Sequence, residues 1–363
     1  MPQDDLSDFE RALDWYPPAY WGNRLNLLLL ADAEPLVDPR DYLRRLDQPN
    51  LVGEAREFSI EPELAWPFPT FRVDTRPSAQ QVQLQLADGV ERAKRFLPTQ
   101  RDLAGMISAQ ATLLHPDVVA LMVVDGLSYY DLDEASAAQP IIVDGVTITD
   151  HGYRQVIGSP PVSARLFRAG YMDQRGYSFF DRKANDLAAD LFHPFADIQL
   201  TRVRQFAEVL ADLEARPVTH TYVQVTSPGL DGICHQHPDA PPVQYYLQSL
   251  LQKFTKLVEC LSARHSSVLA FLTSDHGILW REGFEPGTWR IASGLAPEDC
   301  IRGRYVRGAI MRDYTVVVQG DGSTYSLLKY PYLARDWRSN EWGMHGGISA
   351  WESIVPLITR FTG

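Results

Sequence analysis

The sequence predicts an α/β fold: a doubly wound, mainly parallel sheet sandwiched by helices, with an N-terminal accessory region and a late β-hairpin. Three observations support this prediction. The apolar runs Val118–Val124 and Ser267–Thr273 have the continuous hydrophobicity of strands buried on both faces. The long helical pattern Pro242–Ala263 precedes the second run, and strands that alternate with long helices build parallel sheets. Glycine-containing turns with acidic residues follow both runs, where doubly wound enzymes place their chemistry.

Residues 1–110 are predicted to form a mainly helical accessory region. Two amphipathic helices are expected over Ser78–Phe96 and Thr99–Leu114, and Ser78 and Thr99 have the side chains of N-caps. The length of the apolar run Leu27–Leu30 does not decide between a strand and a buried helix. Short helices are also expected over Asp8–Trp15 and Asp41–Leu46.

Residues 111–363 are predicted to form the catalytic core, in which strands and helices alternate after the first buried strand. In chain order, the expected elements are two short strand-like pieces within Ile141–Thr149, a helix over Gln199–Ala215, a strand over Thr219–Val225, the helix Pro242–Ala263, the strand Ser267–Thr273, and a hairpin over Tyr314–Leu328 that turns at Gly320-Asp321-Gly322.

Composition and charge narrow the class of protein. The chain has 363 residues, 45% of them hydrophobic, and a formal net charge of −12, so bulk electrostatics do not favour nucleic acid. The acidic, polar start Met1–Leu6 does not resemble a secretory signal, and no apolar run approaches the roughly 18 residues of a membrane span. These features predict a cytoplasmic protein that has no membrane partner. Three cysteines without CxxC spacing argue against a disulfide framework, although Cys234 could neighbour a metal.

Four short motifs carry carboxylates and imidazoles with the composition of two metal sites. They supply three aspartates and three histidines, which divide into one Asp-Asp-His and one Asp-His-His set. Mixed nitrogen and oxygen ligands suit zinc or manganese better than magnesium or calcium. Each motif alone could be an ordinary turn, but together they predict a two-metal hydrolase. The candidate ligands are Asp125, Asp231, His235, Asp275, His276 and His345.

A two-metal phosphohydrolase also needs a nucleophile, and Ser163 is the predicted one. It begins a predicted helix after the rigid turn Gly158–Pro161, so its hydroxyl would meet the positive end of that helix. A metal bound to Ser163 would lower the pKa of the hydroxyl and generate an alkoxide. Ser159 is the alternative nucleophile.

The order of these motifs resembles that of the alkaline phosphatase superfamily, and more closely that of its PglZ-domain branch. The most specific likeness is the tail His345–Leu357, which is similar to the His-Gly-Gly-x-Ser-x-x-Glu-x-x-x-Pro segment of PglZ domains. The resemblance covers roughly residues 111–363 and implies an alkaline phosphatase-like core. It departs in the nucleophile segment, which usually reads Pro-Thr-x-Thr, whereas Pro160-Pro161-Val162-Ser163 stands here. Within the tail, Ser349 and Glu352 have the spacing of a capping box.

The resemblance also implies how the ligands are shared between the metals, which are usually zinc in this superfamily. Asp125, Asp275 and His276 would hold one metal together with Ser163. Asp231, His235 and His345 would hold the other.

The chemistry implied by the resemblance is phosphodiesterase activity on nucleotide-like substrates, through a phosphoseryl-type intermediate. Nucleotides or oligonucleotides are the expected substrates. Proteins of a phage-defence or signalling system are the expected partners. Two alternatives stay open: a non-catalytic PglZ interaction module with a structural metal site, and a phosphomonoesterase of the same superfamily.

Overall fold

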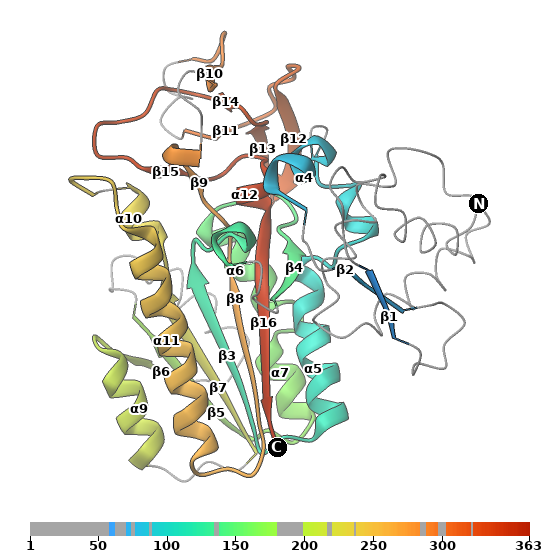
Figure 1. Ribbon diagram of the computed structural model, residues 1–363, viewed down its shortest axis with the longest axis vertical. Coiled ribbons are helices and arrows are strands. Elements are labelled where there is room, and N and C mark those ends of the chain that lie inside the picture. The colour runs from blue at the N-terminus through green and yellow to red at the C-terminus, as the bar shows by residue number, and fades with distance from the viewer. Residues whose placement is uncertain are drawn as a thin grey trace.

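The computed structural model describes residues 58–61, 70–73, 77–86, 89–133, 138–179, 199–215, 220–235, 237–283, 288–296, 303–320 and 322–363. A central sheet carries helices on both faces, and smaller sheets formed by residues 279–344 lie beyond one end of it (Figure 1). The helices expected over residues 8–15 and 41–46, and the apolar run 27–30, lie outside the described residues. None of the described helices is both long and apolar enough to cross a membrane.

The central sheet has seven strands in the order β4-β16-β8-β3-β7-β5-β6 and confirms the predicted fold class. Five neighbouring strands are parallel, and β16 runs antiparallel to both of its neighbours. The strands are β3 (Val118–Asp125), β4 (Ala138–Ile142), β5 (Asp173–Ser178), β6 (Gln199–Arg202), β7 (Thr221–Pro228), β8 (Val268–Ser274) and β16 (Ile354–Thr362).

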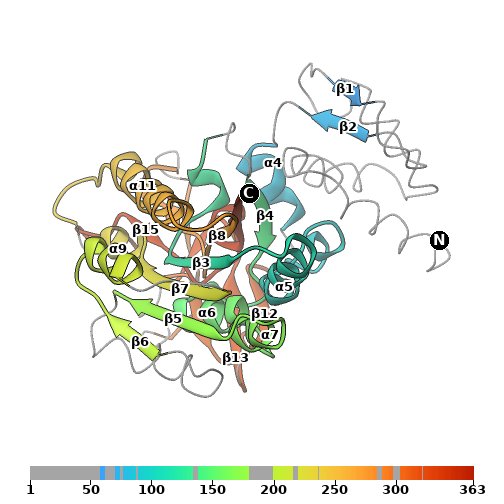
Figure 2. The same cartoon turned by 90° about the horizontal axis from the view of Figure 1, so that it is seen from below.

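The two faces of the sheet have separate hydrophobic cores, because side chains alternate along each strand. Along β3, Val118, Ala120, Met122 and Val124 face one core, which the helices α9 (Phe206–Ala215) and α11 (Val243–Ser262) cover. The intervening residues Val119, Leu121 and Val123 face the other core. That core is covered by α5 (Leu103–Leu114), α6 (Thr149–Ile157) and α7 (Val162–Arg168). Figure 2 shows α9 and α11 on one side of the sheet and α6 and α7 on the other.

The described residues before 115 are only partly helical and contribute to the same cores. They form the strand pair β1 (Phe58–Glu61) and β2 (Thr70–Val73), the helix α4 (Ala79–Gln85), and the 3-10 turns η2 (Ala93–Arg95) and η3 (Gln100–Asp102) ahead of α5. Side chains of α4 and α5 pack into the two sheet cores. The division of the chain at residue 110 stays a prediction.

Both predicted N-caps are confirmed, but the helix expected over Ser78–Phe96 is broken. Ser78 accepts a hydrogen bond from the Gln81 amide, and Thr99 forms a capping box with Asp102. The first helix ends at Gln85, and Gly89 follows with a φ of 117°, a left-handed conformation that a continuous helix does not contain.

Two further sequence-based elements differ from the structure. The segment Gln199–Ala215, expected to be one helix, begins as strand β6 before α9 starts at Phe206. Within Ile141–Thr149 only the end of β4 is a strand, and the second piece is the turn that enters α6.

The predicted late hairpin is confirmed as β12 (Thr315–Gly320) and β13 (Ser323–Leu328), which pair antiparallel. With β11 (Tyr305–Arg307) they form a separate three-stranded sheet. Short elements complete this end of the molecule: η4 (Tyr129–Asp131), α10 (Asp231–His235), β9 (Leu279–Trp280), η5 (Arg281–Gly283), β10 (Arg290–Ile291), β14 (Tyr332–Leu333), β15 (Gly343–Met344) and α12 (Ala350–Ser353).

Candidate metal centre

Three neighbouring parallel strands bring the predicted aspartates to one edge of the sheet. In the register, Asp125 at the end of β3 lies opposite Pro228 of β7, and Val124 lies opposite Ser274 of β8. Asp275 follows Ser274 directly, and α10 begins at Asp231 shortly after β7. The three carboxylates therefore meet because these strands end together.

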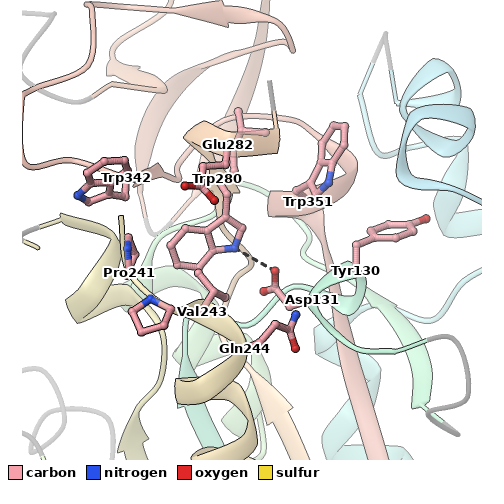
Figure 3. A pocket seen from close by; sticks show the side chains of 11 residues that line it. Tyr130, Asp131, Pro241, Val243, Gln244, Trp280, Glu282, Trp342 and Trp351 are labelled. Carbon is pink, nitrogen blue, oxygen red and sulfur yellow. Dashed lines mark hydrogen bonds between the residues drawn. The ribbon is translucent and has the colours of Figure 1, made fainter. Parts of the chain in front are cut away.

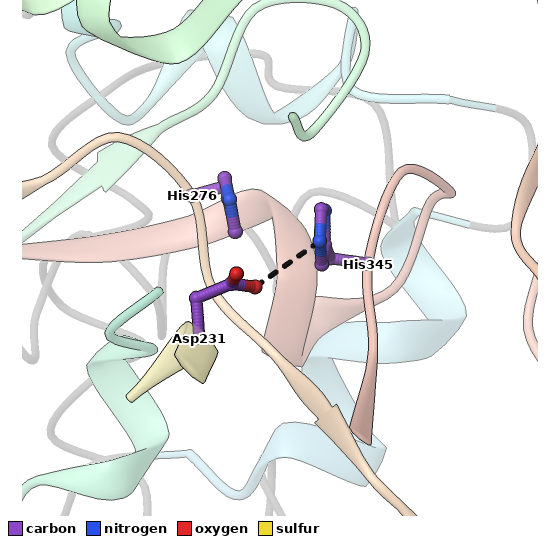
Figure 4. Close-up of side chains that lie close together, drawn as sticks. All are labelled: Asp231, His276 and His345. Carbon is purple, nitrogen blue, oxygen red and sulfur yellow. Dashed lines mark ion pairs between the residues drawn. The ribbon is translucent and has the colours of Figure 1, made fainter. Parts of the chain in front are cut away.

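The fourth motif reaches the same edge through a short strand pair. Met344 of β15 pairs with Leu279 of β9, which places His345 beside the loop that contains His276. Figure 4 shows Asp231, His276 and His345 pointing toward one another from three different segments. The structure thus brings all six predicted ligands into one cluster.

One group of the cluster consists of Asp125, Asp275 and His276. The Nε2 atom of His276 lies 3.4 Å from Asp125 Oδ1 and 3.7 Å from Asp275 Oδ2. Asp275 and His276 are completely buried, so burial and the neighbouring Asp125 raise the pKa of the Asp275 carboxyl well above its usual value. Burial opposes a charge on His276, but its contact with Asp125 raises the imidazole pKa.

The other group surrounds Asp231 Oδ1. This oxygen lies 3.2 Å from His235 Nε2 and 3.1 Å from His345 Nε2, and the two nitrogens are 2.9 Å apart. Burial alone would raise the pKa of Asp231, but the two imidazoles hold it well below its usual value. With zinc bonds of about 2.0–2.1 Å, neighbouring ligand atoms in a tetrahedral site lie ~3.3 Å apart, which is close to these separations.

The hydrogen bonds of two imidazoles test whether a metal fits the cluster. His276 Nδ1 lies 3.0 Å from the carbonyl of Gly277, and His345 Nδ1 lies 2.9 Å from that of Thr147. A carbonyl only accepts, so each Nδ1 donates its hydrogen to that carbonyl, and Nε2 is the ring atom that faces the carboxylate oxygens. Asp275 Oδ2 is buried and has no hydrogen-bond partner among the described residues. Imidazole nitrogens and carboxylate oxygens that converge in this way are a ligand set that suits a bound cation.

A hydroxyl that the motifs do not predict lies at the cluster. Thr149 is the first residue of α6, and its Oγ1 lies 3.3 Å from both Asp125 Oδ1 and His276 Nε2. Gly152 allows this approach, because a Cβ there would lie 2.0 Å from the carbonyl oxygen of Asp275. The positive end of the α6 dipole adds to the attraction for negative charge at Thr149.

The structure does not bring Ser163 to the cluster. Ser163 lies in α7, which begins only after the nine residues of α6, and nine helical residues span about 13 Å. Its neighbours Val162 and Leu166 pack in the core with α5, and its carbonyl accepts a hydrogen bond from Gln174. Ser159 follows the far end of α6. The hydroxyl that the structure places at the cluster is therefore that of Thr149 and not that of the predicted Ser163, because the N-terminal end of α6 faces the sheet edge.

A signal for Thr149 was present in the sequence. Thr147-Ile148-Thr149 matches the two threonines of the Pro-Thr-x-Thr pattern, with Val146 in the proline position. The Pro160–Ser163 segment has the proline of the pattern but neither of its threonines. The threonines of the pattern therefore point to this segment, whereas its proline points to residues 160–163.

A buried ion pair supports the loop that carries His345. Glu352 and Arg304 are both completely buried, and Arg304 Nη2 lies 2.6 Å from Glu352 Oε2. Glu352 Oε1 accepts a hydrogen bond from the Gly347 amide, two residues after His345. Ser349 caps α12 as predicted and also donates to Glu352. Glu352 therefore stabilises the loop that carries His345 and is not one of the candidate ligands.

An aromatic cavity lies beside the ligand loops. It has a volume of about 510 Å³, and Trp280, Trp342 and Trp351 form much of its wall (Figure 3). Trp280 Nε1 donates to Asp131 Oδ1 at 2.9 Å. None of the six candidate ligands lines this cavity.

Cys234 is buried between this wall and the cluster. A Cβ at Gly343 would lie 2.8 Å from the Cys234 Cβ and 3.3 Å from the Trp280 ring. The Cys234 thiol lies 3.7 Å from Asp231 Oδ1, and burial raises its pKa well above the usual value. A protonated thiol is a weak donor to that carboxylate.

Comparison with known proteins finds similarity only among solved structures. No protein-family model and no curated protein matches the chain. Murine ectonucleotide pyrophosphatase/phosphodiesterase 5 is 12% identical, with 66% of this chain and 87% of that chain covered and a TM-score of 0.43. The periplasmic domain of the phosphoethanolamine transferase EptC from Campylobacter jejuni is 9% identical, with 68% and 79% covered and a TM-score of 0.36. The corresponding domain of Escherichia coli EptC in complex with zinc is 12% identical, with 45% and 64% covered and a TM-score of 0.27.

Proposed function

We propose that this protein is a two-metal-dependent phosphohydrolase in which Thr149 is the nucleophile. The observation that carries the proposal is the position of the Thr149 hydroxyl, 3.3 Å from a carboxylate and 3.3 Å from an imidazole of the ligand cluster. It stands at the first residue of a helix whose dipole favours an alkoxide and phosphate oxygens.

The two groups of side chains would each hold one divalent metal, zinc or manganese by the nature of their ligands. Asp125, Asp275 and His276 would hold one, with the Thr149 hydroxyl beside it. Asp231, His235 and His345 would hold the other; bound metals would stabilise negative charge on the attacking and leaving oxygens.

The residues of the chain would then perform an in-line displacement in two steps. Thr149 Oγ1 forms a bond to phosphorus as the bond to the leaving oxygen breaks, and the leaving group departs as its alkoxide, which takes up a proton from water. The hydroxyl proton has Asp125 Oδ1 as its nearest acidic acceptor. Water then attacks phosphorus, the bond to Thr149 breaks, and phosphate or a phosphomonoester is released.

A diester of a nucleotide is the proposed substrate class. Among the described residues, no ion pair joins a lysine or arginine to a carboxylate of the cluster, so a monoester dianion finds little help there beyond the metals. The PglZ likeness of the sequence supports the same class. A role beside partner proteins of a defence or signalling system remains a prediction from that likeness.

The test compares Thr149→Ala with Ser163→Ala in zinc-loaded protein, using bis-p-nitrophenyl phosphate as substrate. Thr149→Ala should abolish turnover and keep two metals, whereas Ser163→Ala and Ser159→Ala should stay near wild type. Mass spectrometry of acid-quenched wild-type protein should find phosphate on the peptide that contains Thr149. A fully active Thr149→Ala protein would refute the nucleophile assignment, and an inactive wild type with full metal content would favour a non-catalytic module.

A further inference from the structure

Thr147 makes three contacts with the loop that carries His345. Its hydroxyl accepts a hydrogen bond from the Gly346 amide at 2.9 Å and donates one to the Gly347 carbonyl at 3.0 Å. Its own carbonyl lies 2.9 Å from His345 Nδ1. The side chain of Thr147 is completely buried, so these bonds are sheltered from water.

The three contacts act together on one imidazole. The carbonyl of Thr147 accepts the hydrogen on His345 Nδ1, which leaves Nε2 as the ring atom that faces the Asp231 carboxylate, 3.1 Å from its Oδ1. The hydroxyl holds the two residues after His345, so the ring cannot turn away while the loop stays in place. Partners that orient a ligand in this way typically change metal affinity 10–100-fold when they are removed.

Thr147 also stands two residues before Thr149, in the turn that enters α6. The same short segment therefore carries the hydroxyl at the Asp125 group and the carbonyl that orients a ligand of the Asp231 group. Glu352 supports the loop from a different contact, the Gly347 amide, and makes no contact with His345 itself among the described residues.

We propose that Thr147 is a positioning residue that sets the metal affinity of the Asp231–His235–His345 group. It also holds that group in place relative to the turn that carries Thr149. The inference rests on the proposed function, because it assumes that the cluster binds metals. Its direct consequence is selectivity: loss of the Thr147 hydroxyl should weaken one of the two metal sites and spare the other.

The test measures zinc affinity by competition with a chromophoric chelator in wild type, Thr147→Val and Thr147→Ser. Valine keeps the shape of threonine and removes the hydroxyl, whereas serine keeps the hydroxyl. Thr147→Val should weaken one of two zinc ions by about 10–100-fold and leave the other unchanged, and Thr147→Ser should stay near wild type. Thr226→Val is the matched control, because the buried Thr226 hydroxyl has no hydrogen-bond partner among the described residues.

A selective loss that serine restores supports the inference. Two unchanged affinities, two equally reduced affinities, failure of serine to restore binding, or a single zinc site in wild type would each overturn it. If Thr147→Val does not yield folded protein, Thr147→Ala removes the same hydroxyl without added bulk and is read in the same way. Turnover is assayed separately. If Thr147→Val weakens only one of two zinc ions but the wild type hydrolyses no ester, the proposed function is refuted and this inference still holds.

Discussion

The imidazole rings of His276 and His345 are stacked, with their centroids 4.1 Å apart and their planes 14° from parallel. In the proposed division the two rings belong to different ligand groups, although both also lie close to Asp231, and each donates Nδ1–H to a backbone carbonyl. One ligand nitrogen of each ring and a carboxylate oxygen of Asp231 all lie within 4.8 Å of one another. The two candidate metal sites are therefore adjacent, as two-metal hydrolases require.

Gly152→Ala is expected to damage the site, although the same change elsewhere should stabilise the fold. The new Cβ would fall 2.0 Å from the Asp275 carbonyl oxygen, so α6 must move away and take Thr149 with it. We expect turnover to fall about 100-fold, because displacement of a nucleophile by ~1 Å has effects of that size. The measurement is kcat on bis-p-nitrophenyl phosphate.

The matched control for this change is Gly105→Ala in α5, where nothing lies within 4 Å of the new Cβ. Alanine in a helix interior should raise the free energy of unfolding by about 0.5–1 kcal/mol and leave kcat unchanged. Equal kcat values for the two variants would show that α6 can shift without disturbing the nucleophile.

Arg304→Leu is expected to destabilise the protein strongly. The change leaves the buried Glu352 carboxylate without its cation, and breaking a buried pair typically costs about 3–5 kcal/mol. Urea unfolding monitored by tryptophan fluorescence measures the loss. Glu91→Gln removes a partner of Lys94 that is 83% exposed and should cost about 0–1 kcal/mol. Similar costs for both variants would contradict the role given to the buried pair.

Asp275→Asn should change the pH dependence of stability in metal-free protein. The raised pKa of Asp275 means that the folded carboxyl stays protonated at pH values where the unfolded one has ionised. The free energy of unfolding therefore falls as the pH rises from the carboxyl pKa of the unfolded state toward that of the folded state, by about 1.4 kcal/mol for each pH unit between the two. Asparagine does not titrate, so the free energy of unfolding of the variant should increase relative to that of wild type between pH 4 and pH 7 in EDTA.

Zinc should reverse this order, because the carboxylate of Asp275 is a candidate ligand and asparagine is a poorer one. Thermal unfolding at both pH values, with EDTA or with zinc, gives the four comparisons. A wild type that zinc does not stabilise relative to the variant would argue against Asp275 as a ligand.

Diesters are expected to be hydrolysed faster than monoesters. A monoester dianion needs a further cation, but Arg165 lies in α7, which does not reach the cluster, and Arg335 donates to both oxygens of Glu341. We expect kcat/KM for bis-p-nitrophenyl phosphate to exceed that for p-nitrophenyl phosphate about tenfold, or ~1.4 kcal/mol. A clear monoester preference at matched zinc would contradict the diesterase proposal.

The sequence was sufficient to predict the parallel core and the meeting of the ligands. Asp125 and Asp275 follow continuous apolar strands, so their place at the sheet edge follows from the strand pattern alone. The choice between Thr149 and Ser163 could not be made in that way, because both lie at the start of a helix. Which helix start faces the sheet edge is a tertiary property, set by contacts such as that of Gly152 with Asp275.

The strand β16 also escaped prediction, and its proline explains why. Pro356 lacks an amide hydrogen, and proline within an apolar run normally argues against a central strand. In the structure Pro356 pairs only with Pro140 of β4, and pairing with β8 begins at the next residue, Leu357. The proline therefore lies one residue before β16 begins to pair with β8. No local pattern in the sequence contains this information.

The central position of β16 has a consequence for the order of events during synthesis. Residues 354–362 leave the ribosome after every other strand of the sheet, yet they join β4 to β8. Until they emerge, β8 presents an open edge in the middle of the future sheet. The His345 loop immediately precedes them, so the last imidazole and the last strand become available together. If the proposed two-metal site is correct, a nascent chain should therefore be unable to retain a second metal before its sheet can close.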